Sequence, residues 1–108
     1  MVADGTGSPS DASAYDWVLR RSRARRAVLE YLATCGPSYA AAIARATGLN
    51  DVACVGALRG LGKRYAPERS LLALGLVRAS AGQAGGPRRY DITPLGARVA
   101  ARERAMKP

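Results

Sequence analysis

Cationic side chains are the most prominent chemical feature of this sequence. Its 108 residues include 17 lysines and arginines against 8 acidic residues, for a formal net charge of +9. Fifteen of these cations are arginines, and five of them fall between Arg20 and Arg26. Such an excess favours a polyanionic partner, because neutralising phosphates releases condensed counterions. The alternative is a basic surface, including a solvated helix at 20–26, that serves solubility alone.

Side chains suited to catalysis or metal binding are scarce. Histidine is absent from the sequence, which removes the usual general base and every Ser-His or Cys-His nucleophile pair. The two cysteines, Cys35 and Cys54, make neither a disulfide framework nor a recognisable zinc site. The glycine-rich segment 81–87 follows no phosphate-binding motif. We therefore expect neither enzyme activity nor a cofactor.

The cations must be positioned by short elements around one small core, since this length suits a single domain. Residues 1–13 are rich in Gly, Ser, Asp and Ala and are expected to form a disordered tail. They lack the features of a signal peptide, and no apolar run approaches the ~20 residues of a membrane span. We accordingly expect a cytoplasmic protein. A long helix is predicted over residues 14–35, its first half projecting because Arg21 and Arg25 interrupt the apolar arc.

Two short helices within residues 39–60 form the centre of the predicted fold. Gly48 suits a left-handed cap that ends the first helix, and Asn50 can cap the second. The side chains expected in the core are Ala40, Ile43 and Ala44 on the first helix and Val52, Val55 and Leu58 on the second. This spacing is typical of a helix-turn-helix.

The remaining elements complete the predicted fold. A basic loop and a helical turn occupy residues 61–75, with Pro67 suited to the first helical position. A β-hairpin over residues 76–92 follows, in which alternation directs Tyr90 and Ile92 inward. Thr93 can cap a C-terminal helix over residues 94–106. The whole is a mainly α fold with a small β-hairpin, namely one winged helix-turn-helix domain over residues 14–108.

The chain resembles small archaeal winged-helix regulators, broadly similar to the ArsR and MarR groups. The resemblance rests on Y-A-A-A-I-A-R-A-T-G-L-N-D-V-A-C-V-G-A-L-R-G at 39–60, L-L-A-L-G-L-V at 71–77 and R-R-Y-D-I-T-P-L-G at 88–96. The insertion 61–70 departs from MarR-type proteins. The resemblance implies binding of double-stranded DNA as a homodimer joined through the first and last helices. Winged helices also serve as protein- or RNA-interaction modules, which is the alternative.

The residues expected to contact DNA lie on the second helix of this pair and beside it. Its outward face is predicted to carry Asn50, Ala53, Cys54, Ala57 and Gly60. Only Asn50 could read a base edge by hydrogen bonding, while the alanines could meet thymine methyl groups. Weak sequence preference and a dominance of phosphate contacts are therefore predicted. The phosphate contacts are assigned to Ser38, Tyr39, Arg59, Lys63, Arg64, Arg88 and Arg89, with Gln83 reaching the minor groove from the hairpin tip.

The two cysteines are expected in different surroundings. Cys35 falls within the apolar arc of the long helix, so we predict a buried, inert thiol. Cys54 is predicted to point partly outward, where it could sense oxidation or link subunits. A redox switch is thus a hypothesis that the sequence alone leaves open.

Overall fold

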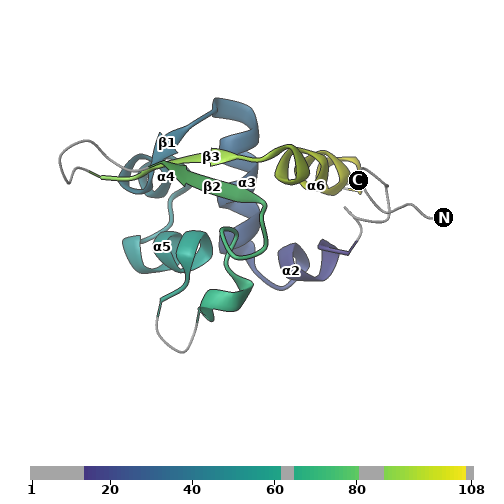
Figure 1. Cartoon of the computed structure of the whole chain (residues 1–108), viewed down its shortest axis with the longest axis horizontal. Coiled ribbons are helices and arrows are strands. Elements are labelled where there is room, and N and C mark those ends of the chain that lie inside the picture. The colour runs from purple at the N-terminus through teal and green to yellow at the C-terminus, as the bar shows by residue number, and fades with distance from the viewer. Residues whose placement is uncertain (1–13, 62–64, 81–86, 107–108) are drawn as a thin grey trace.

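The computed structural model describes residues 14–61, 65–80 and 87–106, and is mainly helical with a small antiparallel sheet (Figure 1). Its helices are α2 (Asp16–Arg20), α3 (Arg23–Cys35), α4 (Ala40–Thr47), α5 (Asp51–Arg59) and α6 (Pro94–Met106), with a 3₁₀ turn η1 (Pro67–Arg69). Its strands are β1 (Ser38–Tyr39), β2 (Val77–Ser80) and β3 (Arg89–Ile92). The predicted tail, Lys63, Arg64 and Gln83 all lie outside the described residues.

The sheet has the order β1-β3-β2, with both pairings antiparallel. The predicted hairpin is confirmed, because Val77 pairs with Ile92 and Ser80 pairs with Arg89. Tyr90 is buried, as the alternation along β3 predicted. The segment before α4 contributes a third strand, β1, whose Ser38 pairs with Tyr90. This pairing joins the start of α4 to the hairpin.

The connection between α4 and α5 forms as its residue types predicted. Gly48 adopts the left-handed conformation at the end of α4, with φ of 76°. Asn50 caps α5, because its Oδ1 accepts a hydrogen bond of 2.7 Å from the Ala53 amide. Thr47 Oγ1 donates to the Ile43 carbonyl at 2.7 Å and closes the last turn of α4. Local side-chain chemistry therefore sets both ends of this connection.

The predicted buried side of α5 is partly wrong. Val52 is 57% exposed and Val55 is half-buried, whereas Cys54 and Ala57 are fully enclosed beside Leu58. The reason is close packing, since the Cys54 thiol lies 3.4 Å from the Ala40 carbonyl of α4 and donates to it. Small side chains allow α5 to approach α4 and α3, and the bulkier valines are left toward solvent.

The N-terminal segment is two helices rather than the one that was predicted. Ser22 adopts an extended conformation between them, and its Oγ accepts a hydrogen bond of 3.1 Å from the Arg25 amide. The chain turns at this cap, so α2 packs against α3 and α6 and does not project. Val18 and Leu19 are buried there, and Asp16 pairs with Arg102 of α6. The preference of serine for helix N-caps indicated this break, but the helical periodicity of the apolar residues led us to predict one continuous helix.

One core joins these elements around α3, the central helix in Figure 1. Its largest fully enclosed side chains include Leu19, Val28, Leu29, Leu32, Ile43, Leu58, Leu71, Leu76, Val77 and Val99. Thr93 caps α6 as predicted, accepting a hydrogen bond of 3.0 Å from the Gly96 amide. None of the helices in the described ranges is both long and apolar enough to cross a membrane.

Candidate nucleic-acid interface

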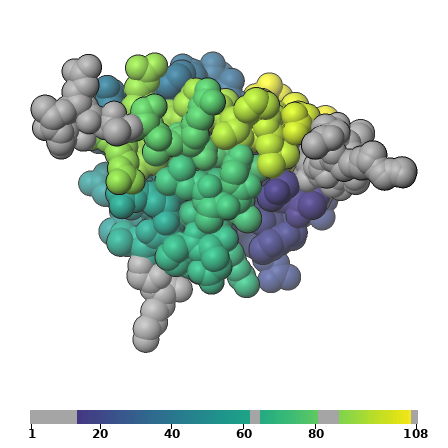
Figure 2. Space-filling model, in the orientation of Figure 1, coloured from purple at the N-terminus to yellow at the C-terminus, as the bar shows by residue number. Residues whose placement is uncertain are grey.

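A concave surface lies where the start of α4, the outer side of α5 and the base of the hairpin meet. We call it the basic hollow, and its volume is about 420 Å³. Its lining residues are Tyr39, Ala40, Ala41, Val55, Arg59, Pro87, Arg88 and Tyr90. Three residues predicted to bind phosphate, namely Tyr39, Arg59 and Arg88, are thus brought together from segments far apart in the chain. In Figure 2 the surfaces of β3 (yellow-green) and α5 (teal) adjoin on the left of the molecule.

The charge of the basic hollow is positive. Arg59 and Arg88 are exposed, and within the described residues neither forms an ion pair. Arg89 is also exposed and lies opposite Tyr39 in the sheet register. No acidic side chain is among the described residues that line the hollow. Exposed guanidinium groups without carboxylate partners are free to bind a polyanion.

The first turn of α4 adds a second source of positive potential to the hollow. Ala40 and Ala41 line it, and Tyr39, which precedes the helix, makes no side-chain capping hydrogen bond. The first amides of a helix carry partial positive charge, and without a capping side chain they can donate to a phosphate oxygen. Ser38 is half-buried in β1, where its backbone pairs with Tyr90. The hollow therefore combines two arginines with a helix N-terminus.

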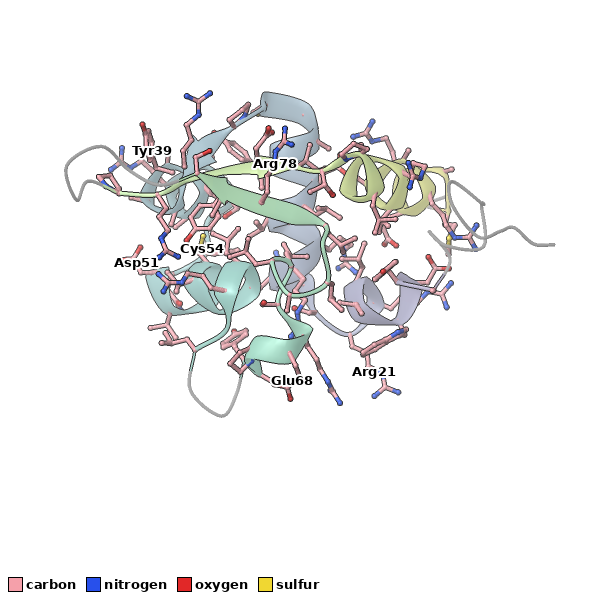
Figure 3. All side chains as sticks on the ribbon, viewed as in Figure 1. Arg21, Tyr39, Asp51, Cys54, Glu68 and Arg78 are labelled. Atoms are coloured by element: carbon pink, nitrogen blue, oxygen red, sulfur yellow. The ribbon has the colours of Figure 1, made fainter. Side chains whose placement is uncertain are left out.

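The outward face of α5 differs from the predicted one. Asp51, Val52 and Arg59 are exposed and Val55 is half-exposed; these four positions lie within roughly 100° of arc on a helix. Of the predicted face, Cys54 and Ala57 are buried, and Ala53 lines a different cavity. Asn50 is exposed, but its Oδ1 is occupied by the cap. Figure 3 places Tyr39 and Asp51 at the same end of the molecule.

Val52 and Val55 are the outward residues that the sequence argument missed. Their hydrophobicity suggested a core position, and nothing local identifies them as exposed. The available signal was the run of small residues at Cys54, Gly56 and Ala57, which suits close helix packing better than a solvent-facing surface.

The environments of the two cysteines are the reverse of those predicted. Cys35 is exposed at the end of α3, whereas Cys54 is 1% exposed in the core. Burial, reinforced by the nearby Asp51 carboxylate, raises the pKa of the Cys54 thiol to about 11. A thiol that stays protonated at neutral pH is a poor oxidation sensor. The predicted redox role of Cys54 is therefore not supported, and it cannot link subunits from the core.

Metal ligands do not gather in the part of the chain that the structure describes. No group of three or more Cys, Asp or Glu side chains there could hold a metal ion.

Comparison with known protein families gives a match over most of the chain. The model of the family described as EarA-like matches residues 17–102. The chain belongs to the EarA-like family. The match covers α3 to β3 entirely, and with them every residue of the basic hollow. No curated protein and no solved structure matches the chain. The function of this EarA-like protein must therefore be inferred from its own surfaces.

Proposed function

We propose that this chain binds double-stranded DNA as a winged helix-turn-helix protein, either a transcriptional regulator or a weakly sequence-specific DNA-associated protein. The basic hollow is the observation that supports this function best. It joins Arg59 of α5, Arg88 beside β3 and the uncapped start of α4 on one concave surface. In the proposed mode α5 enters the major groove, and the β2–β3 hairpin acts as the wing.

Phosphate contacts carry most of the affinity in this proposal. Arg59 and Arg88 bind the backbone as charged donors, and Arg89 extends the basic surface along β3. The start of α4 receives one phosphate on its free amides. Each phosphate neutralised releases counterions, so affinity falls steeply with salt.

Base recognition is weak in this proposal, because the outward face of α5 has few polar groups. Val52 and Val55 can contact thymine methyl groups, whereas Arg59 is the longest donor on that face. Asp51 complements the N-terminal dipole of α5 and repels phosphate. Sequence preference then depends on thymine positions and on the shape of the duplex.

The proposal is tested by measuring binding of random duplex, single-stranded DNA and structured RNA between 50 and 200 mM salt. We expect duplex to bind tightest, with log K falling linearly against log salt. Binding that is independent of salt, or tighter on structured RNA, would contradict the proposal. The second outcome would favour the interaction-module alternative, for which the exposed apolar side chain of Val52 is the supporting observation.

A homodimer through the first and last helices stays a prediction. Within one chain α2 already packs on α6 through Asp16 and Arg102. The large apolar side chains left exposed on the described parts of these helices are Trp17, at 46%, and Met106, at 42%. The Arg69 guanidinium lies over the Trp17 ring at 5.6 Å, which covers part of that surface. Sedimentation equilibrium across a range of concentrations tests the prediction directly.

A further inference from the structure

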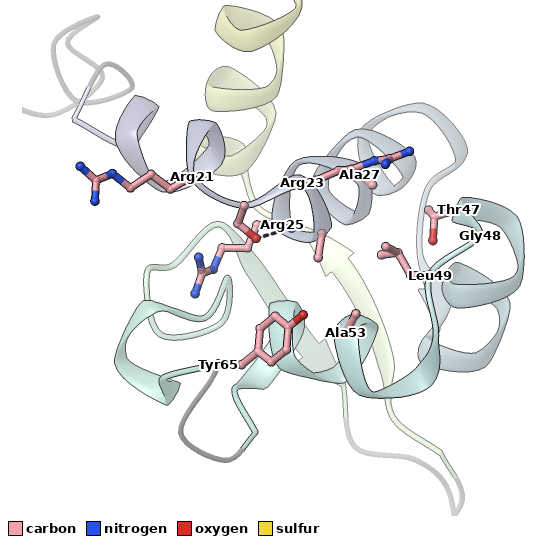
Figure 4. Close-up of a pocket in the computed structure, with 11 residues that line it drawn as sticks. Arg21, Arg23, Arg25, Ala27, Thr47, Gly48, Leu49, Ala53 and Tyr65 are labelled. Atoms are coloured by element: carbon pink, nitrogen blue, oxygen red, sulfur yellow. Dashed lines mark hydrogen bonds between the residues drawn. The ribbon is translucent and has the colours of Figure 1, made fainter.

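A second cavity, of about 560 Å³, lies between the first turn of α3 and the α4–α5 connection (Figure 4). We call it the Arg25 cavity. In Figure 4, Arg25 and Tyr65 lie on one side of this space and Leu49 and Ala53 on the other. Arg21 and Arg23 extend to opposite sides at its rim. No acidic side chain is among the described residues that line it. Three arginines, Arg21, Arg23 and Arg25, are thus among the residues that line the cavity.

Arg25 is the unusual residue of this cavity. Arg25 is only 9% exposed, and its buried Nε has no hydrogen-bond partner among the described residues. Among the residues that the structure describes, no carboxylate forms an ion pair with it. Burial lowers the pKa of Arg25, and the positive charge of Arg69 lowers it further. Removing a guanidinium from water is unfavourable, so an anion that accepts a hydrogen bond from Arg25 would offset part of this cost.

The N-terminus of α3 adds to the positive potential at the same place. This helix is 13 residues long, and Ser22, its cap, also lines the cavity. The Ser22 hydroxyl accepts a hydrogen bond from the Arg25 amide. Within the described ranges the amides of Arg23 and Ala24 make no hydrogen bond. The N-terminal dipole of α3, the amides of its first turn and the Arg25 guanidinium therefore all favour an anion in this cavity.

We propose that the Arg25 cavity binds the phosphate group of a small molecule. A guanidinium presents paired donors whose spacing matches two oxygens of a phosphate. The partner is small because Arg25 lies at the wall of a recess, whereas a duplex presents its phosphates on a broad convex surface. This inference does not depend on DNA binding by the chain.

The Arg25 cavity is separate from the basic hollow. None of the described residues lines both. Helix α5 contributes Ala53 to the Arg25 cavity and Val55 to the basic hollow. Residues two positions apart in a helix are separated by about 200° of rotation. The two surfaces therefore lie on nearly opposite sides of α5, and a ligand in the cavity should not compete with a duplex.

Thermal unfolding and titration calorimetry test the proposal with inorganic phosphate, pyrophosphate and a nucleoside monophosphate, at ionic strength held constant with chloride. We expect a saturable rise in the Tm of the natural sequence with phosphate compounds and none with chloride. The relative affinities distinguish a bare phosphate from an organic one. The Arg25→Met variant should start at a higher Tm, because the unpaired charge is gone, and should lose the phosphate-dependent rise. Arg23→Met, at the exposed rim, should weaken binding about tenfold.

The matched control is Arg98→Met, which removes an exposed cation from α6 and should bind like the natural sequence. The proposal is overturned if no phosphate compound raises the Tm beyond chloride, or if Arg25→Met binds as tightly as Arg98→Met. It is also overturned if duplex DNA displaces pyrophosphate competitively, because the cavity would then belong to a polynucleotide surface.

Discussion

The ring of Tyr65 lies directly against the α carbon of Gly56. A Cβ atom placed on Gly56 would overlap the Tyr65 ring, reaching Cδ2 at 2.6 Å and the Tyr65 Cβ at 2.8 Å. This contact covers the side of α5 between its outward face and Ala53. Tyr65, outside the helix, thus helps to decide which part of α5 remains open to a partner.

Gly56→Ala should lower the free energy of unfolding by about 1 kcal/mol, although alanine is the better helix former. Overpacking against Tyr65 destabilises the folded state by ~1–3 kcal/mol, whereas the higher helix propensity of alanine stabilises it by about 1 kcal/mol. In a Tyr65→Ala background the same substitution should instead stabilise by about 1 kcal/mol. Urea unfolding of the four proteins of this double-mutant cycle measures the difference. Equal effects in both backgrounds would show that the two residues do not touch.

Arg59→Ala and Arg88→Ala should each weaken binding to all duplex sequences about equally. Each removes one phosphate contact, so the slope of log K against log salt should fall in magnitude by about 1. Fluorescence anisotropy with a labelled duplex measures both quantities. Arg98→Ala, which removes a charge from α6, is the control and should leave the slope unchanged. If all three variants bind alike, the basic hollow does not hold DNA.

Asp16→Asn should lower the free energy of unfolding by roughly 0.5–1 kcal/mol. The Arg102 Nε lies 3.1 Å from both carboxylate oxygens of Asp16, and the Asp16 side chain is 15% exposed. Glu30→Gln is the control, because its pair with Arg104 is more exposed and should contribute less. Denaturant unfolding compares the two variants. No loss from Asp16→Asn would be the result expected of a helix that projects into solvent.

Thiol labelling at pH 8 should modify Cys35 quickly and Cys54 only after unfolding. Cys35 is exposed, whereas Cys54 is enclosed and its pKa is raised to about 11. A thiol reagent with an absorbing product should therefore count one reactive group in the native protein and two in denaturant. Rapid reaction of both groups in the native state would contradict this assignment.

The raised pKa of Cys54 also predicts a loss of stability in alkali. Because the folded pKa exceeds the unfolded value of about 9.0, folding favours the protonated thiol. This contribution is fully present below pH 9 and is lost as pH rises through about 11, with an upper limit of about 3 kcal/mol. Cys54→Ala should lack this contribution, whereas Cys35→Ala should retain it. Chemical unfolding between pH 8 and 11 measures the difference between the variants.

Local chemistry made much of this fold predictable. Asn50 and Thr93 cap helices, Gly48 takes positive φ, and Tyr90 faces inward because strands alternate. Each of these outcomes depends on a residue and its neighbours within a few positions. Ser22 belongs to the same class, and the break between α2 and α3 could have been predicted from its capping preference.

The exposed side of a short helix could not be predicted in the same way. Helix α5 has nine residues, so an error of one position rotates its face by about 100°. The packing of Cys54 against Ala40 and of Tyr65 against Gly56 sets that rotation. Both contacts join different segments of the chain, so the hydrophobic pattern within α5 could not predict them.

The excess of arginine, the order of the elements and their caps thus follow from the sequence, since they depend on composition and near neighbours. Tertiary structure decided where the charges gather. It brought Arg59 and Arg88 to one hollow, and it buried Arg25 at the wall of another cavity. It also packed α2 against α6, where Asp16 and Arg102 form an ion pair although they lie 86 residues apart in the sequence. The physical reason is that burial and charge clustering are set by contacts between distant segments, and these exist only once the core has packed.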